Sequence, residues 1–160
     1  MLFRSPLGQC YLIPYGNQCQ FQLGYKGLLE LAFRTGLYSV IYAVNVYAED
    51  EFKYELGFNK TLHHVPKKGP KSGEPIAYYA VYKLKDGTGD FCVMWKEEVE
   101  AHGKKYSKSY NSGPWKSNFS AMAKKTTIIE VLKYAPKSIE LAEAISKEKD
   151  RKSTRLNSSH

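Results

Sequence analysis

The residues best suited to chemistry lie at 107–126, SKSYNSGPWKSNFSAMAKKT, where small polar side chains precede a helical pattern and a lysine pair. Its hydroxyl, amide and backbone donors are Ser107, Ser109, Asn111, Ser112 and Gly113. A helix N-terminus preceded by such donors can hold phosphate oxygens. The same residues are also ordinary capping and turn residues, with Pro114 suited to the first helical position, so a purely structural role stays open.

Helix geometry separates the lysine pair, Lys124 and Lys125, from the face that carries Phe119. At about 100° per residue, Phe119, Met122 and Thr126 share one face, and the lysines straddle the opposite side. We therefore expect both ammonium groups to lie away from the packed face. An isolated lysine pair is more often merely solvated than functional, so the surrounding charge has to decide.

Basic charge is concentrated around this stretch. Residues 104–137 contain one acid, Glu130, and these lysines: Lys104, Lys105, Lys108, Lys116, Lys124, Lys125, Lys133 and Lys137. Such clustering favours a polyanionic partner. Nucleic acid is favoured over a membrane because no strongly amphipathic basic helix accompanies the lysines.

Aromatic side chains accompany two of the basic residues. A protein that binds single-stranded nucleic acid needs cations for the backbone and flat apolar surfaces for exposed bases. Tyr25 precedes Lys26, and Trp115 precedes Lys116, so both chemistries occur side by side. Trp115 could equally be a core anchor at helical spacing from Phe119, and both interpretations stay open.

Signatures of catalysis and metal binding are weak. Residues 67–75, KKGPKSGEP, lack the P-loop spacing and do not join a strand to a helix in a parallel unit. His63 and His64 are adjacent in a strand-like run, so they point to opposite faces and cannot share a metal. Glu97 and Glu98 open a helix, where acids favour the helix dipole. We expect no catalytic residue, metal or cofactor.

The order of the elements is typical of an α+β domain. Residues 10–15 and 19–25 read as a hairpin, and residues 26–36 as a helix that ends near Gly36. Strands are expected within 39–57, and a second hairpin, 76–84 with 90–95, surrounds Asp86-Gly87. Helical periods follow at 96–105, 115–134 and 138–148. We expect antiparallel hairpins and a small sheet packed against helices in segregated layers.

A chain of 160 residues is the size of one domain, which we place at residues 6–149. Residues 1–5 and 150–160 are typical of adaptor or vector sequence and are set aside. Their four basic residues, Arg4, Arg151, Lys152 and Arg155, with the acidic Asp150, contribute +3 of the formal net charge of +8. Three cysteines without CxxC spacing, and no secretory signal, favour a reducing cytoplasm.

Three segments together resemble the RecT family of phage-type single-strand annealing proteins. They are SPLGQCYLIPYGNQCQFQLGYKGLLELAFRTG at 5–36, EPIAYYAVYKLKDGTGDFCVMWKEEVEAH at 74–102, and SKSYNSGPWKSNFSAMAKKT with LKYAPKS at 107–138. The combination of GYKG before a helix, GPW and MAKKT is specific as a set. Members carry a further N-terminal helical segment and a C-terminal tail, so we expect this sequence to be a fragment of a longer reading frame.

The resemblance implies ATP-independent binding of single-stranded DNA and annealing of complementary strands in homologous recombination. It also implies assembly into rings or helical filaments, a phage exonuclease as partner, and the cytoplasm of a bacterial host. The positions carried over, with Lys116 added from its place beside Trp115, are Lys26, Arg34, Ser107, Lys108, Asn111, Trp115, Lys116, Lys124, Lys125 and Lys133. After MAKKT the family often has basic residues, where this chain has Ile128, Ile129 and Glu130. Cationic contacts from that turn are therefore doubtful.

Two other functions compete with annealing. A nuclease would need clustered acidic metal ligands near the basic surface, and the sequence offers only Glu130 there. A protein-interaction or self-assembly module could instead use a surface rich in tyrosine, of which the chain has 13.

Overall fold

A computed structural model of the chain describes residues 3–4, 10–15 and 18–157. It contains three antiparallel sheets and five α-helices within these residues, which confirms the α+β fold class. The first sheet pairs β1 (Phe3–Arg4), β2 (Cys10–Tyr15) and β3 (Gln18–Leu23). The second has the order β4 (Tyr38–Val46), β7 (Ala77–Leu84) and β8 (Gly89–Trp95). The third is the hairpin of β5 (Glu51–Glu55) and β6 (Thr61–Val65).

Local turn chemistry accounts for the second predicted hairpin, which is confirmed. Strands β7 and β8 pair in antiparallel register from Ala77↔Trp95 to Lys83↔Gly89. Gly87 between them has φ +93°, a left-handed conformation that glycine adopts without steric cost. The first predicted hairpin is confirmed in its strands, while its turn residues 16 and 17 lie outside the described residues.

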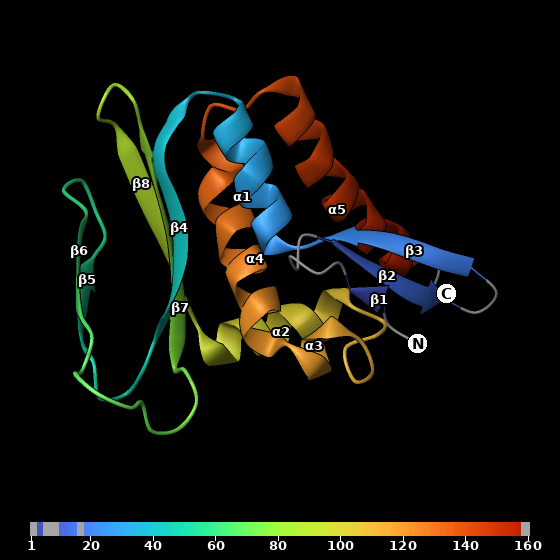
Figure 1. Cartoon of the computed structure of the whole chain (residues 1–160), viewed down its shortest axis with the longest axis horizontal. Coiled ribbons are helices and arrows are strands. Elements are labelled where there is room, and N and C mark those ends of the chain that lie inside the picture. Colours follow the sequence, from blue (N-terminus) through green and yellow to red (C-terminus); the bar gives the residue numbers. More distant parts are fainter. Residues whose placement is uncertain (1–2, 5–9, 16–17, 158–160) are drawn as a thin grey trace.

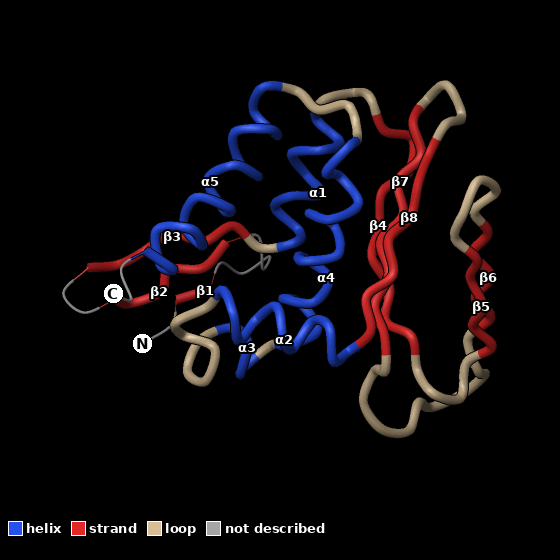
Figure 2. Tube along the Cα trace, turned by 180° about the vertical axis from the view of Figure 1, so that it is seen from behind, coloured by secondary structure: helices blue, strands red, loops and turns tan. Residues whose placement is uncertain are grey.

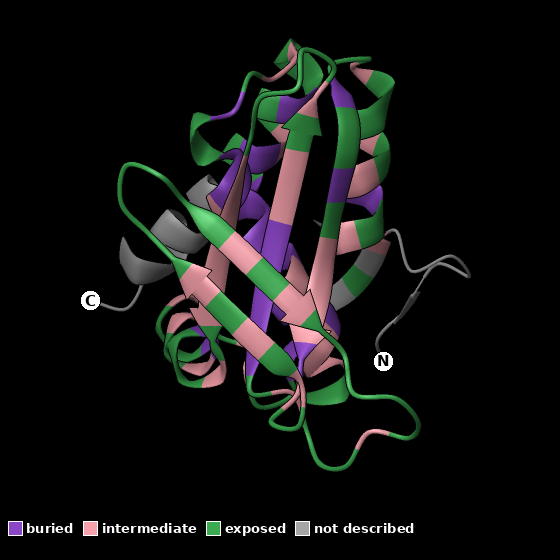
Figure 3. Cartoon of the chain, turned by 90° about the vertical axis from the view of Figure 1, so that its left-hand side faces the viewer, coloured by how far each residue is buried: buried purple, intermediate pink, exposed green. Residues whose placement is uncertain are grey.

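The β5–β6 hairpin covers one face of the β4-β7-β8 sheet, and helices cover the other (Figure 1). Strand alternation produces this arrangement, because neighbouring residues of β7 point to opposite faces. Tyr79 faces the hairpin, where its ring stacks on Phe52 with centroids 5.8 Å apart. Tyr78 and Ala80 face the helices and are fully buried. Figure 3 shows the hairpin lying across the sheet, with exposed and half-buried residues alternating along its strands.

Five helices form the second layer: α1 (Tyr25–Arg34), α2 (Lys96–Tyr106), α3 (Pro114–Ser117), α4 (Phe119–Val131) and α5 (Ile139–Asn157). A 3₁₀ turn, Leu132–Tyr134, ends α4. Helix α4 packs against all three strands of the central sheet and also against α1. Seen from behind, the helices separate the central sheet from the β1–β3 sheet (Figure 2). Helix α4 is therefore an interior helix rather than a surface helix with one buried stripe.

The predicted helix over residues 115–134 is wrong in one respect, because it is broken at Asn118. Asn118 has φ −150° and ψ 66°, and its Oδ1 accepts a hydrogen bond from the Ala121 N–H at 3.4 Å. This side chain caps α4, which favours a fresh helix start over a continuous helix. Helix α5 runs through residues 150–157, which were expected to belong to a non-native end. The limits of the domain stay a prediction.

Replacing Gly103 in α2 with alanine is expected to lower the free energy of unfolding by about 1–3 kcal/mol, as overpacking does. An added Cβ would lie 2.7 Å from the Tyr110 ring and 3.0 Å from the Trp115 ring. At an open helix position the same change would stabilise by about 1 kcal/mol. Urea denaturation of Gly103→Ala measures whether the free energy of unfolding falls or rises. The control is Ala101→Gly, at an exposed position of α2, which reports helix propensity alone. Stabilisation by Gly103→Ala would contradict the packing.

Candidate functional site

Two predicted basic residues meet where the start of α1 lies against α4. The Nζ atom of Lys124 lies 5.4 Å from the centroid of the Tyr25 ring. Lys26 is exposed in the first turn of α1. The pKa of Lys124 is lowered, first by partial burial and then by the nearby positive charge of Lys26. No ion pair between described side chains involves Lys26 or Lys124. We call Tyr25, Lys26 and Lys124 the Lys26–Lys124 cluster.

The backbone adds to the positive potential of this cluster. Helix α1 begins after Gly24, no side chain caps it, and no acid lies in its first turn. The first amide groups of a helix point outward without intrahelical acceptors and carry the positive end of the helix dipole. Two cations beside such a helix start repel each other, and a bound anion would relieve that repulsion.

Lys125 does not lie on the exposed surface, so that expectation is wrong. Its side chain is only 4% exposed, and its Nζ donates to Oε2 of Glu148 at 2.6 Å. The prediction assumed one buried face, whereas α4 is covered on several sides and α5 closes over the side that holds Lys125. The neighbouring hydroxyls of Thr126 and Thr127 are also buried and donate to backbone carbonyls within α4.

The serine- and asparagine-rich turn between α2 and α3 is folded on itself. The carbonyl of Ser109 accepts hydrogen bonds from the amides of Ser112 and Gly113, at 3.1 and 2.7 Å. The hydroxyls of Ser107 and Ser109 lie 3.5 Å apart. A Cβ on Gly113 would lie 2.9 Å from the Ser109 hydroxyl and 3.0 Å from the Ser109 carbonyl oxygen, so glycine fits this position better than a larger residue. Several predicted donors therefore stabilise the turn itself.

Three other predicted residues of this region lie exposed at the surface, and one lies in the core. The exposed side chains are Lys108, Asn111 and Lys116. Trp115 is only 6% exposed and packs between Tyr110 and Phe119, with both ring centroids 5.7 Å away. Of the two interpretations of Trp115, the structure supports the core anchor, because a ring enclosed in this way has no free face for a base.

Arg34 is the last residue of α1, and Lys133 lies in the 3₁₀ turn that follows α4, so both are away from the cluster along the chain. Arg34 follows Lys26 by eight positions, which corresponds to a rise of about 12 Å along a helix. Arg34 pairs with Glu30 at 3.1 Å, and Lys133 lies 3.9 Å from Glu130. Exposed pairs of this kind are weak and leave both cations available to a stronger anion.

The turn after MAKKT belongs to the core. Ile128 is fully buried and Ile129 is 5% exposed, within the cluster that joins α1, α4 and α5. The departure from the family pattern therefore has a structural reason, since basic side chains at these two positions would be buried among apolar ones. Contacts to an anion are not expected from this turn.

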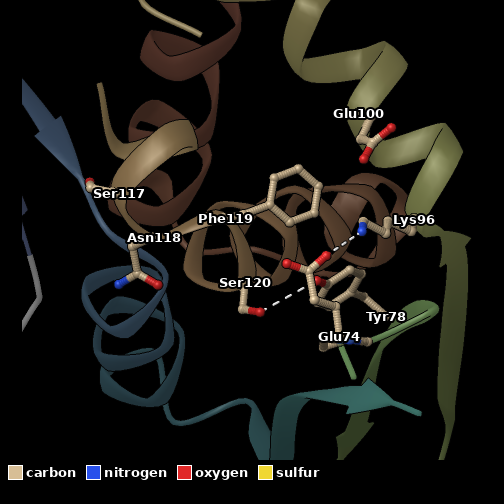
Figure 4. A pocket seen from close by; sticks show the side chains of 9 residues that line it. Glu74, Tyr78, Lys96, Glu100, Ser117, Asn118, Phe119 and Ser120 are labelled. Atoms are coloured by element: carbon tan, nitrogen blue, oxygen red, sulfur yellow. Dashed lines mark hydrogen bonds and ion pairs between the residues drawn. The ribbon is translucent and has the colours of Figure 1, made fainter. Parts of the chain in front are cut away.

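A pocket of ≈ 400 Å³ lies beside the α3–α4 break (Figure 4). Two carboxylates line it, Glu74 and Glu100, and Glu74 accepts from Lys96 at 2.5 Å. Tyr78 and Ser120 approach each other at its base, with hydroxyl oxygens 3.3 Å apart. Because two carboxylates face a lysine that is already paired, the pocket disfavours phosphate and lies outside the proposed anion site.

Sequence reasoning missed a buried polar network beneath the β5–β6 hairpin. His64 is 5% exposed in its side chain, and its Nε2 lies 3.0 Å from Oδ2 of Asp50. With Nε2–H donating to this carboxylate, Nδ1 accepts from the Tyr79 hydroxyl at 3.0 Å. Lys71 donates to Oδ1 of Asp50 at 2.6 Å. His63 points outward, which confirms that the two histidines face opposite sides. The sequence signal for the burial of His64 is the alternation of exposed and half-buried positions along β6.

The described residues contain neither a metal-binding group nor a membrane-spanning helix. No group of three or more histidine, cysteine, aspartate or glutamate side chains could hold a metal ion there. None of the helices in this part of the chain is long and apolar enough to cross a membrane. Glu98 is structural, as expected, because its carboxylate accepts from the Trp95 amide at 2.8 Å at the start of α2.

Comparison with known proteins identifies relatives across nearly the whole chain. A model of the RecT family matches residues 2–158. Protein RecT of Escherichia coli is 39% identical over 151 residues, which cover 89% of this chain and 55% of that protein. The uncharacterized protein YqaK of Bacillus subtilis is 35% identical over 150 residues, which cover 89% of this chain and 49% of that protein. The chain thus spans about half the length of these relatives.

Proposed function

Because the chain belongs to the RecT family, we propose that it binds single-stranded DNA and anneals complementary strands without ATP or a metal ion, in phage-type homologous recombination. The observation that carries this proposal is the Lys26–Lys124 cluster at the uncapped start of α1. Two cations without a described acidic partner, beside a helix N-terminus, form a site for one or two backbone phosphates.

Contacts to the phosphate backbone of DNA are compatible with strand annealing. Lysines that hold phosphates leave base edges free to pair with an incoming strand, whereas contacts to base edges would block pairing. Tyr25 adds an aromatic ring beside Lys124. The exposed side chains of Lys108, Asn111 and Lys116 extend the phosphate track along the α2–α3 turn. Arg34 and Lys133 extend it toward the other ends of α1 and α4, while Trp115 and Lys125 support it from inside.

Assembly and partners follow from the same proposal. Copies of the chain form a ring or helical filament on DNA, so that a continuous track of lysines holds one strand. A phage exonuclease supplies the single strand in the cytoplasm of the bacterial host. No step in this scheme breaks a covalent bond, so the protein acts by binding rather than by catalysis.

The test is fluorescence anisotropy with a labelled single strand across a salt series. We expect Lys26→Ala/Lys124→Ala to weaken binding at least tenfold at low salt. Because each phosphate contact on a single strand contributes about 0.7 to the slope of log K against log salt, losing two should lower that slope by about 1.4. Strands of different sequence should bind alike.

The matched control is Lys60→Ala/Lys67→Ala, which removes the same charge from the hairpin side of the protein. Both lysines are exposed and paired with carboxylates, Lys60 with Asp90 and Lys67 with Glu49. This variant should keep the affinity and the slope. Equal slopes for all three proteins would overturn the proposal, as would binding that does not weaken with salt.

A self-assembly module without DNA contact is the second candidate. The exposed apolar tip of the β5–β6 hairpin favours it, since Phe58 is fully exposed and Leu56 is 66% exposed. Gel filtration with and without an oligonucleotide separates the two functions. Assembly that forms without DNA and never co-elutes with it would support the module instead.

A further inference from the structure

Glu148 lies on the buried face of α5, where an apolar residue would be expected. Leu141, Ile145 and Glu148 follow the i, i+4, i+7 spacing of one helix face, and all three are buried. A carboxylate in such a place is costly unless it is paired and hydrogen-bonded. Its position therefore calls for a role beyond packing.

The two carboxylate oxygens of Glu148 bind two different elements. Oε2 accepts from Nζ of Lys125 in α4 at 2.6 Å, and Oε1 accepts from the backbone amide of Leu23 at 3.4 Å. Leu23 ends β3, and Gly24 follows it as the residue before α1. One side chain thus joins α5, α4 and the β3–α1 junction.

These contacts lie directly next to the Lys26–Lys124 cluster. Lys125 follows Lys124 in α4, and Leu23 lies three residues before Lys26. Lys26 and Lys124 repel each other, which tends to move the start of α1 away from α4. Glu148 holds the two backbones together at this point and neutralises Lys125 below them. On this basis we infer that Glu148 is a positioning residue, which keeps the Lys26–Lys124 cluster in its phosphate-binding geometry through Lys125 and Leu23.

This inference rests on the proposed function, and Glu148→Gln tests it. The amide keeps the shape of the side chain and removes the charge, which leaves Lys125 buried without its ion pair. We expect the variant to bind a labelled oligo(dT) about tenfold more weakly than the wild type. Amide hydrogen exchange should rise in the segment from Leu23 to Lys26 and stay unchanged in β7.

Two further variants separate positioning from stability and from direct contact. Ile145→Ala, on the same face of α5, should lower the melting temperature while leaving DNA affinity unchanged. Lys125→Met/Glu148→Gln removes both buried charges, and the glutamine Oε1 can still accept from the Leu23 amide, so this variant should restore both folding and affinity. If Glu148→Gln does not fold, this double variant provides the test of the positioning role in its place.

Each outcome decides between explanations. Tighter binding by Glu148→Gln with a steeper salt slope would overturn the inference, because it would mean that Glu148 masks a lysine that itself contacts DNA. Weak binding that persists in Lys125→Met/Glu148→Gln would also overturn it, because it would mean that Lys125 itself contacts DNA. If Ile145→Ala lowers DNA affinity as much as Glu148→Gln does, Glu148 only stabilises the fold and the inference is overturned. If the wild type fails to bind DNA, or does not respond to Lys26→Ala/Lys124→Ala, the proposed function itself fails.

Discussion

Replacement of Asp50 by alanine is expected to lower the free energy of unfolding by about 3–5 kcal/mol, the range for breaking a buried charge pair. The Asp50 side chain is 1% exposed and accepts hydrogen bonds from Lys71, from His64 and from the backbone amides of Tyr47 and Lys67. Removing the carboxylate takes this acceptor from His64 and from the two backbone amides, and it leaves Lys71 without its counter-charge beneath the β5–β6 hairpin. The hairpin should then detach from the central sheet more readily than the rest of the fold.

Urea denaturation monitored by circular dichroism measures this loss. The control is Glu49→Ala, because Glu49 is the neighbouring acid and binds Lys67 at the surface. That variant should keep nearly full stability, since exposed pairs contribute little. A stability of Asp50→Ala equal to that of Glu49→Ala would show that the buried network does not hold the hairpin.

Acid pH should also lower the free energy of unfolding, because protonation of the Asp50 carboxylate favours the unfolded state. Burial alone would raise the pKa of Asp50, but the hydrogen bonds from Lys71, the Tyr47 amide, His64 and Lys67 outweigh it and hold the pKa well below its usual range. A carboxyl whose pKa is depressed on folding stabilises the protein above its unfolded pKa of about 3.9, and this contribution is lost as the pH falls toward the folded value. Between about pH 4 and pH 2, the wild type should lose stability more steeply than Asp50→Asn.

Replacement of Trp115 by alanine should cost about 3–5 kcal/mol of unfolding free energy, as expected for a large core aromatic. Trp115 packs in the cluster formed by Tyr78, Val99, Met122 and Ala123, where α2 and α4 meet the sheet. Loss of the ring leaves a cavity beneath the α2–α3 turn and α3, which carry the exposed Lys108, Asn111 and Lys116. DNA binding should therefore fall only in proportion to the unfolded fraction.

Trp115→Phe distinguishes a core role from contact with DNA. The smaller ring keeps most of the packing, so it should lower the melting temperature modestly and leave the affinity of the folded protein unchanged. Lys116→Ala is the paired control, since Lys116 is exposed and adjacent; it should weaken binding and keep the stability. A Trp115→Phe variant that binds DNA more weakly at full stability would show that the ring contacts the strand.

Local patterns predicted much of the fold correctly. The Asp86-Gly87 turn places β7 against β8, and the period of residues 26–36 places a helix that ends before Gly36, whose φ is +71°. These features depend on residues that are neighbours in the chain. The break at Asn118 was missed because a capping side chain competes with the helical pattern over a single residue.

The candidate site was only partly predictable. A helical wheel tells which residues of α4 share a face, but not how many elements cover the helix, and this is why Lys125 was expected at the surface and Trp115 was left open. Asp50, His64 and Tyr79 come from a loop and two strands that are distant in sequence. No spacing rule brings such residues together.

The sequence by itself determined the α+β class, the motifs of the RecT family and the concentration of lysines between residues 104 and 137. These follow from composition and from short-range periodicity. Only the tertiary structure decided which cations can meet an anion. The packing of α1 on α4 brings Lys26 beside Lys124, and α5 buries Lys125 against Glu148. Exposure of a charge depends on which elements pack over it, and that is a property of contacts between segments far apart in the chain.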